Sequence, residues 1–522
     1  MKLVNAATMR AVDAEAIDKQ GIPSLQLMES AGGGVAERIL ESILDKPEGS
    51  LVAVFCGKGN NGGDGFVIAR HLFEAEADVD IYHIGPVDKL STDAKANYDL
   101  CRKLKINITE IEVAEDLPEE LDCDLVIDAI FGTGFEGTPR GISAELIEYI
   151  NLSDAPVVAV DLPSGLNADT GQAEGAVVAA DFTFTLALPK LGLYLSPGRE
   201  LSGTVVTVPI GIPDSVVDKF DIKNELITPE WVSETLPYRA PEGHKGDFGK
   251  LLCITGSTGL TGAAALTAQA AYRTGCGMVK IGCPKTVQPI LATMLVETMC
   301  HPLPDVARKG ALALRALGEV RKMAGQVDAL VVGPGVGLHH ETGELIRRFV
   351  RQNSQPIVID ADGITHICKE LDCIRQSTAP TVLSPHIGEF ARLIAGADWN
   401  ETVADTIPER AEQAGRFAKE FNVVLILKGS PTVVASPDGA TWFNQTGNSG
   451  MGTGGSGDVL SGMIGSFLAQ GLSAIDAALT AVFIHGLSGD MAVESIGERS
   501  LIASDLVRTL PDALQFIEKL ED

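Results

Sequence analysis

Residues 51–66 read LVAVFCGKGNNGGDGF, and this stretch decides the fold of the first part of the chain. Six apolar residues run into a glycine-rich turn, and a helical pattern over 66–73 follows directly. A short, wholly apolar run is typical of a strand buried on both faces of a parallel sheet. We therefore expect a strand over 51–56, a tight turn and a helix, which together begin a βαβ unit.

The same order of apolar run, turn and helical pattern recurs in both halves of the chain. In the first half of the chain, further strands are expected over 124–130, 156–160, 181–188 and 203–208. In the second half they are expected over 251–255, 278–282, 329–332, 356–359, 381–384 and 423–427. A chain of 522 residues is too long for one core, since a domain usually takes roughly 100 to 200 residues. We therefore predict two α/β domains, at 1–213 and 228–522, joined by a linker over 214–227.

Composition limits the partners of this chain. Its 41 basic and 70 acidic residues give a net charge of -29, which repels a nucleic acid backbone. No apolar stretch reaches the roughly 18 residues that cross a bilayer, and the first residues do not resemble a signal peptide. The nine cysteines contain no C-x-x-C pair, so we expect reduced thiols rather than disulfides or a zinc site. We expect a cytoplasmic homo-oligomer without nucleic acid or membrane partners.

The first glycine turn has the composition of a ligand site. Gly57, Gly59 and Gly62 fit G-x-G-x-x-G, which lets a phosphate approach the backbone at a helix N-terminus. A tight turn without a ligand would also explain these glycines. The neighbouring Asn60, Asn61 and Asp64 favour the ligand, because a plain turn does not need their polar groups.

Two aspartates follow later strands of the same half. Asp128 and Asp161 end apolar runs, and the carboxyl ends of parallel strands share one crevice. Oxygen atoms of Asn61, Asp128 and Ser164 would suit a hard cation. Asp128 could instead cap a following helix. The flexible loop at 132–138 is expected to cover a substrate.

These motifs resemble NAD(P)H-hydrate epimerases over essentially residues 1–213. The resemblance rests on the runs at 9–13, 21–23, 27–32, 60–64 and 160–165. It implies a Rossmann-like three-layer α/β/α domain with potassium held by Asn61, Asp128 and Ser164. It also implies a hydrated-nucleotide site formed by Asn60, Asn61, Gly62, Gly63, Asp64, Gly132, Thr133, Gly134, Phe135, Glu136, Gly137, Thr138 and Asp161. We expect Asp161 to be the catalytic carboxylate, helping the C6 hydroxyl to leave and return.

The second half contains the strongest motif of the chain. Residues 444–462 read NQTGNSGMGTGGSGDVLSG and lead into a helix that should end near Gly471. Unhindered N–H groups at a helix N-terminus can stabilise a phosphoryl group during its transfer. Asp458, in the first turn, is placed to take a proton from an attacking hydroxyl, although it could also serve only as a helix cap. No Walker motif occurs, so a P-loop enzyme is disfavoured.

Two further strand ends in this half carry polar residues. Lys428 ends a strand before a tight turn at 429–432 that would suit a nucleotide. His386 follows another strand, and we expect it to be functional although a single histidine is often structural.

The second half resembles the NAD(P)H-hydrate dehydratases, which are ribokinase-like α/β/α proteins, from about 228 to 520. The matching motifs lie at 244–249, 262–264, 333–337, 360–363, 384–386 and 450–458. One departure is Gly452, where such proteins often have alanine. The resemblance implies a hydrated-nucleotide site at Ala263, Gly335, His386 and Asp458. It implies a nucleotide site at Lys428, Gly429, Ser430, Pro431, Thr432 and Gly457.

The two resemblances together imply repair of hydrated NADH and NADPH. The first domain would interconvert the R and S epimers, and the second would phosphorylate the C6 hydroxyl of the S epimer and eliminate phosphate. Mg²⁺ is expected with ADP or ATP as the phosphoryl donor; bacterial members typically use ADP. The main alternative is a kinase of a small hydroxylated vitamin precursor, which would use Asp458 in the same way. A nicotinamide-dependent dehydrogenase and a non-enzymatic binding module are further alternatives for the first domain.

Overall fold

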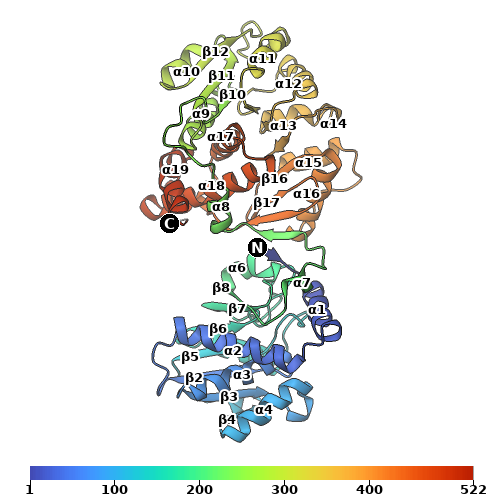
Figure 1. Cartoon of the computed structure of the whole chain (residues 1–522), viewed down its shortest axis with the longest axis vertical. Helices are drawn as coiled ribbons and strands as arrows, with labels where there is room; N and C mark the ends of the chain where they lie inside the picture. The colour runs from blue at the N-terminus through green and yellow to red at the C-terminus, as the bar shows by residue number, and fades with distance from the viewer. Residues whose placement is uncertain (521–522) are drawn as a thin grey trace. The chain divides into compact units, whose positions relative to one another are not determined.

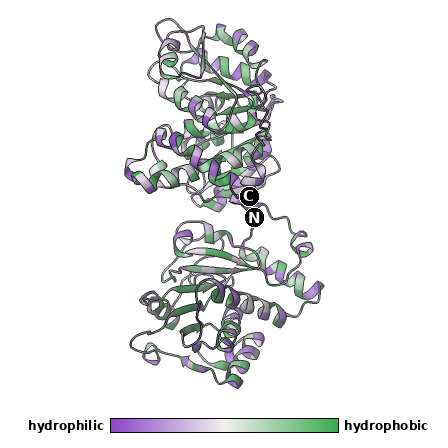
Figure 2. Ribbon diagram, turned by 60° about the vertical axis from the view of Figure 1, so that its left-hand side comes forward, coloured by the Kyte–Doolittle hydropathy of each residue, from purple (hydrophilic) through white to green (hydrophobic). Residues whose placement is uncertain are grey.

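The computed structural model describes residues 1–520 and divides into two compact units, residues 2–224 and 225–520. Each unit is an open α/β structure (Figure 1). Hydrophobic residues gather in the strands and on the helix faces that cover them (Figure 2). The α/β class expected for both halves is confirmed.

The first unit is built on a parallel sheet with the strand order β4-β3-β2-β5-β6-β7-β8. Its strands are β2 (Leu51–Cys56), β3 (Asp78–Ile84), β4 (Asn107–Ile111), β5 (Leu125–Ala129), β6 (Val157–Val160), β7 (Phe182–Leu186) and β8 (Thr204–Val208). Its helices are α1 (Ala6–Ala14), α2 (Ser24–Ser42), α3 (Asn60–Glu74), α4 (Thr92–Leu104), α5 (Ile142–Asn151), α6 (Gly198–Leu201) and α7 (Asp214–Val217). The chain builds outward from β2 to β4 and then returns to β5. This reversal leaves a crevice between the carboxyl ends of β2 and β5.

Alternation along β2 forms two core layers. Val52, Val54 and Cys56 pack with residues of α2, α3 and α4, whereas Ala53 and Phe55 pack with residues of α5. A strand covered on both faces must be apolar throughout, which is why this strand could be read from the sequence.

The glycine run differs from the expected turn because it is already helical. α3 begins at Asn60, six residues before the expected start. A Cβ at Gly62 would lie 1.9 Å from the carbonyl oxygen of Gly57, and one at Gly65 would lie 2.7 Å from the Cβ of Ala129. These glycines therefore allow the first turns of α3 to pack directly on the ends of β2 and β5.

The second unit has the sheet order β9-β18-β17-β16-β15-β14-β13-β10-β11-β12. Its strands are β9 (Asn224–Leu226), β10 (Lys250–Ile254), β11 (Met278–Pro284), β12 (Met299–Leu303), β13 (Ala329–Val332), β14 (Ile357–Ile359), β15 (Thr381–Leu383), β16 (Val424–Leu427), β17 (Thr432–Ala435) and β18 (Thr441–Asn444). β10 to β16 pair in parallel, and β17 is antiparallel to both of its neighbours. The reversal of strand order here falls between β10 and β13.

Helices cover both faces of the second sheet (Figure 1). One face packs on α8 (Pro229–Thr235), α9 (Thr261–Arg273), α17 (Ser456–Ala469), α18 (Ala474–Ile496) and α19 (Ala503–Glu518). The remaining helices are α10 (Gln288–Met294), α11 (Leu317–Ala324), α12 (His340–Gln352), α13 (Asp362–Ile367), α14 (Asp372–Arg375), α15 (Ile387–Gly396) and α16 (Ile407–Phe421). None of the described helices is both long and apolar enough to cross a membrane.

The division between the units lies inside the stretch 214–227 that was expected to join them. Within this stretch α7 is packed rather than free, because Val216 and Val217 are buried with Val4, Met9 and Val12. The two-residue strand β1 (Lys2–Leu3) precedes α1.

Candidate active sites

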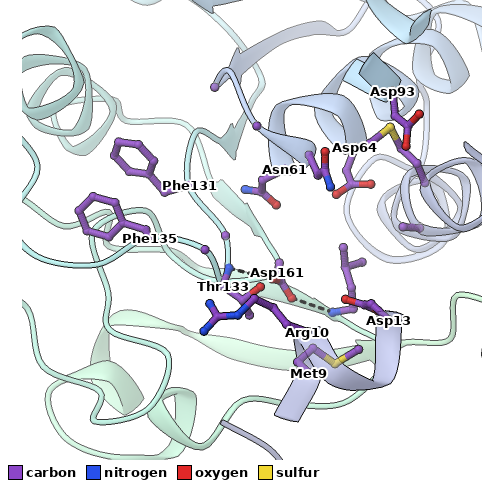
Figure 3. Close-up of a pocket in the computed structure, with 18 of the residues that line it drawn as sticks. Met9, Arg10, Asp13, Asn61, Asp64, Asp93, Phe131, Thr133, Phe135 and Asp161 are labelled. Carbon is purple, nitrogen blue, oxygen red and sulfur yellow. Dashed lines mark hydrogen bonds between the residues drawn. The ribbon is translucent and has the colours of Figure 1, made fainter. Parts of the chain in front are cut away.

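A cavity of about 980 Å³ opens at the carboxyl edge of the first sheet, where the order of strands reverses. Its walls come from α1, α2, the start of α3 and the turns that follow β2, β5 and β6 (Figure 3). Predicted site residues that line it are Asn60, Asn61, Asp64, Gly132, Thr133, Gly134, Phe135, Glu136 and Asp161. The strand reversal is thus accompanied by a cavity of the size that a nucleotide needs.

Asp161 is held in this cavity by three donors. Its side chain forms an ion pair with Lys190, and it accepts hydrogen bonds from the backbone N–H groups of Leu186 and Thr133 at 3.2 and 3.3 Å. Both partners of the ion pair are buried, with Lys190 only 1% exposed. Asp161 has a φ of +70°, a left-handed backbone conformation that is uncommon for residues other than glycine. All three contacts suit a carboxylate, because each is made by a donor.

The loop after β5 forms one wall. Phe131 and Phe135 stack with ring centroids 4.3 Å apart, and both line the cavity. The backbone at Gly132 passes close to two functional groups, since a Cβ there would lie 3.2 Å from Asn61 Oδ1 and from Asp161 Oδ2. The loop therefore places two aromatic rings next to the polar side chains of Asn61 and Asp161.

Four of the predicted substrate residues do not line the cavity. Gly62 is packed against Gly57, and a Cβ at Gly63 would meet the Met28 side chain at 2.5 Å. Gly137 and Thr138 lie further along the loop, and the Thr138 methyl group is next to Gly175. The two glycines of α3 contribute close packing, while Asn60 and Asn61 present the polar groups.

Asp128 and Ser164 lie together beneath the cavity. Ser164 donates to the Asp128 carboxylate from its hydroxyl at 2.6 Å and from its N–H at 2.7 Å, and Ile130 N–H donates at 3.1 Å. Asp128 is fully buried, and this burial raises its pKa to about 6 although the hydrogen bonds oppose the shift. The alternative that Asp128 caps a helix is wrong, because it binds its own turn and Ser164, and the next helix begins only at Ile142.

In the second unit, Asp458 lies in the first turn of α17, directly after the glycine loop. Gly455 precedes this helix with a φ of +99°, which favours glycine. Within residues 1–520 the Asp458 carboxylate accepts no hydrogen bond, so it does not cap the helix. Burial and the nearby Asp360 raise its pKa to about 7, which suits a base that acts near neutral pH.

Lys428 lies beside this helix end. Its Nζ donates to Asp360 at 2.9 Å, and Ser461 on α17 donates to the other Asp360 oxygen at 2.7 Å. Burial alone would lower the pKa of Lys428, but Asp360 and Glu389 outweigh it and the pKa is raised. A Cβ at Gly457 would lie 3.3 Å from Lys428 Nζ. The structure thus places a fixed ammonium group beside the N–H groups of the glycine loop.

The other predicted residues of this unit surround the same sheet edge. His386 is at the start of α15, where its Nδ1 accepts from the N–H groups of Gly388 and Glu389 at 3.0 and 3.3 Å. One ring nitrogen is therefore structural, while the side chain as a whole is 54% exposed. Gly335 lies against Ala263, with 3.0 Å between a Cβ placed on the glycine and that of the alanine. Residues 429–432 form a tight turn in which Thr432 donates to the Gly429 carbonyl at 3.1 Å.

Several contacting residues were given no role from the sequence. Lys190 lies after β7 and could not be paired with Asp161 without the fold. Asp13 and Asp360 lie within matched motifs, which was the available signal, but nothing in their spacing shows what they face. All nine cysteines are free.

Each unit matches a known protein family. Residues 24–192 match the family described as YjeF-related protein N-terminus, and residues 251–512 match NAD(P)H-hydrate dehydratase. The two matches fall on the units that contain the two candidate sites, so the class is a two-domain protein with a dehydratase domain in second place.

Relatives match this chain over nearly their whole length. The chain is 40% identical to the bifunctional NAD(P)H-hydrate repair enzyme of Moorella thermoacetica, over 99% of this chain and 98% of that protein. It is 34% identical to the enzyme of the same name from Escherichia coli, over 97% and 92%. The chain belongs to the family of bifunctional NAD(P)H-hydrate repair enzymes. Among solved structures, an ADP/ATP-dependent NAD(P)H-hydrate dehydratase from Bacillus subtilis, co-crystallised with ATP/Mg²⁺, is 29% identical over 56% of this chain and 99% of that chain, with a TM-score of 0.46.

Proposed function

We propose that this chain repairs hydrated NADH and NADPH at two sites. The first unit interconverts the R and S epimers, and the second converts the S epimer to NADH or NADPH at the expense of ADP or ATP. The observation that carries this proposal is the end-to-end likeness to bifunctional repair enzymes, together with an acidic side chain beside a glycine-rich helix start in each unit. The free thiols suit a reducing compartment, and we propose the cytoplasm.

In the second unit Asp458 acts as the base. It removes the proton of the C6 hydroxyl as this oxygen attacks the terminal phosphorus of the nucleotide, and the shortened nucleotide leaves. The C6–O bond then breaks, phosphate leaves and C5 loses a proton. The C5=C6 double bond that forms restores the dihydropyridine ring. Lys428 and the N–H groups up to Gly457 stabilise the negative charge of the transferred group.

Magnesium fits this site as a companion of the nucleotide. No group of three or more acidic, histidine or cysteine side chains within residues 1–520 could hold a metal. Mg²⁺ is usually held by substrate phosphates and water with one or two carboxylates, so a protein cage is not needed. Asp360 and Glu389, both buried beside Lys428, are the carboxylates that would hold the ion together with the phosphates. When bound, the ion would neutralise phosphate charge.

In the first unit Asp161 is the carboxylate beside the reacting carbon. Epimerisation at C6 requires the hydroxyl to leave and water to return to the other face, with a cationic ring in between. Asp161 Oδ2 faces the cavity next to Gly132, where its charge can stabilise that cation. Phe131 and Phe135 offer an apolar wall to a planar ring.

Potassium fits the oxygen atoms below this cavity. Ser164 donates a hydrogen bond to Asp128. The amide Nδ2 of Asn61 is buried without a hydrogen-bond partner. Carboxylate, hydroxyl and amide oxygens are the ligands that hard cations prefer. A cation held there would offset the unfavourable burial of the Asp128 charge.

Potassium should therefore stabilise the first unit. A ligand at about one hundred times its Kd adds about 2.7 kcal/mol to the folded state, which corresponds to roughly 5 to 10 °C in Tm for a domain of this size. Thermal unfolding in KCl should show this increase over choline chloride at equal ionic strength. Asp128→Asn should remove the difference. Equal Tm values in both salts, or a shift that persists in Asp128→Asn, would contradict the site.

One assay tests the whole proposal. Both epimers of hydrated NADH are mixed with the protein, Mg²⁺ and either ADP or ATP, and recovery of dihydronicotinamide absorbance is followed. We expect complete recovery. A stable phosphorylated product would instead indicate a kinase, and nucleotide turnover that ignores the hydrate would overturn the repair function.

A further inference from the structure

The first cavity contains a carboxyl group that the roles above do not use. Asp13 lies on α1 and lines the cavity. The start of α1 is fixed to the segment that carries Lys190: Val4 N–H donates to Pro189 O at 3.0 Å, and Leu191 N–H donates to Val4 O at 2.9 Å. Asp169 accepts from Ala6 N–H at 2.6 Å. α1 is therefore held as a wall of the cavity.

Asp13 faces charged groups from three other elements. Asp161 follows β6, Lys190 follows β7 and Asp64 is on α3, while Arg10 lies one turn earlier on α1. Asp13, Asp64 and Asp161 surround the same part of the cavity in Figure 3. Three acids thus share one buried ammonium group, and that group is already paired with Asp161. A second acid beside such a pair is favoured in its protonated form.

The pKa values agree with this arrangement. The pKa of Asp13 is raised to about 6, first by burial; Lys190 opposes this shift, and Asp161 adds to it. In many active sites, two carboxyl groups have different pKa values because their surroundings differ. One of them then acts as the acid and the other stabilises charge. Asp64 also has a raised pKa, from burial first, but it is nearly fully buried. Asp13 is only half-buried, so it can exchange its proton with water in each cycle.

We propose that Asp13 is the general acid and base of the epimerase reaction, while Asp161 stays paired with Lys190. This inference rests on the epimerase function proposed above. Protonated Asp13 gives its proton to the C6 hydroxyl, the C6–O bond breaks and water leaves as the lone pair of the ring nitrogen forms a C6=N1 double bond. Water then adds to either face of C6, and the Asp13 carboxylate takes back the released proton. No other reactant is consumed.

The test uses the full chain, in which the dehydratase is an internal control. The R epimer of hydrated NADH is supplied with ADP or ATP and Mg²⁺, with enough dehydratase activity that epimerisation limits the rate, and spontaneous epimerisation is subtracted. For Asp13→Asn we expect kcat for epimerisation to fall by roughly a hundredfold or more, with KM changed little. Turnover of the S epimer should remain normal. Asp18→Asn changes an exposed acid in the π-helical segment Glu15–Lys19, which directly follows α1; it is the matched control and should behave as wild type.

The pH profile separates chemistry from structure. The acid form of Asp13 is lost as pH rises through about 6, so wild-type kcat/KM for epimerisation should decline above that value. Asp13→Asn should lose this decline, and Asp13→Glu should recover part of both rate and profile. The role of Asp13 is overturned if the wild type epimerises the substrate and Asp13→Asn does so at the same rate. It is also overturned if Asp13→Asn keeps the decline of kcat/KM with rising pH. A wild type that leaves the R epimer unchanged overturns the epimerase function itself.

Discussion

Asp458→Asn is expected to reduce dehydration of the S epimer by roughly a thousandfold or more, the range reached when a positioned base is lost. Asparagine keeps the size of the side chain but cannot take the hydroxyl proton. Because the Asp458 carboxylate accepts no hydrogen bond within residues 1–520, its replacement breaks no such contact of the fold. Nucleotide KM and thermal stability should therefore change little. The measurement is single-turnover release of phosphate and of the reduced ring from the S epimer.

The matched control for this variant lies in the same chain. Epimerisation of the R form should proceed at the wild-type rate in Asp458→Asn, because the variant residue belongs to the other unit. Dehydration at the wild-type rate would contradict the mechanism. Loss of both activities together would indicate a folding defect.

The pH dependence of dehydration follows from the same residue. A base works only when ionised, and burial with the charge of Asp360 raises the pKa of Asp458 to about 7. For dehydration, kcat/KM should therefore increase as pH rises from 6 to 8. For epimerisation, kcat/KM should decrease over the same range, because Asp13 must be protonated. Opposite profiles in one chain are measured by supplying the S and R epimers separately. If kcat/KM for dehydration does not change between pH 6 and 8, the ionisation of Asp458 does not control the reaction.

The central strands and the edge strand β8 could be predicted from sequence, whereas β3, β4 and β12 could not. β2 and β13 are unbroken apolar runs, and β5 and β10 are apolar apart from Asp128 and Lys250, as expected for strands covered on both faces. β3 has the sequence DVDIYHI, β4 the sequence NITEI, and β12 includes Pro302, because strands near a sheet edge can alternate or carry polar residues. β17 and β18 were missed for a related reason, since they form an antiparallel extension outside the recurring βα rhythm.

The candidate sites divide in the same way. Asp161 could be selected because it follows a predicted strand, and a parallel sheet brings strand ends to one edge. Asp458 could be selected because it follows a glycine-rich loop at the start of a helix. Lys190 could not, since a lysine near a turn usually remains in solvent and its partner is 29 residues away in the chain. Asp360 also needed the fold, which alone shows that it contacts both Lys428 and Ser461.

Asp161→Asn should reduce epimerisation by roughly a thousandfold, because an amide cannot stabilise the cationic ring as a carboxylate does. Asparagine tolerates the left-handed backbone at this position, so the turn itself should persist. The variant leaves the buried ammonium of Lys190 without its counter-charge, and removing one partner of such a pair costs about 3 to 5 kcal/mol of unfolding free energy.

Stability and chemistry can be separated by a second substitution. Replacing both partners of a buried ion pair with uncharged side chains is often close to neutral for stability. Asp161→Asn combined with Lys190→Met should therefore recover most of the lost unfolding free energy, measured by denaturant titration, yet remain inactive in epimerisation. Recovery of activity together with stability would show that Asp161 only supports the fold. Recovery of stability alone would place its charge in the reaction, since the cavity would again be intact but without the carboxylate.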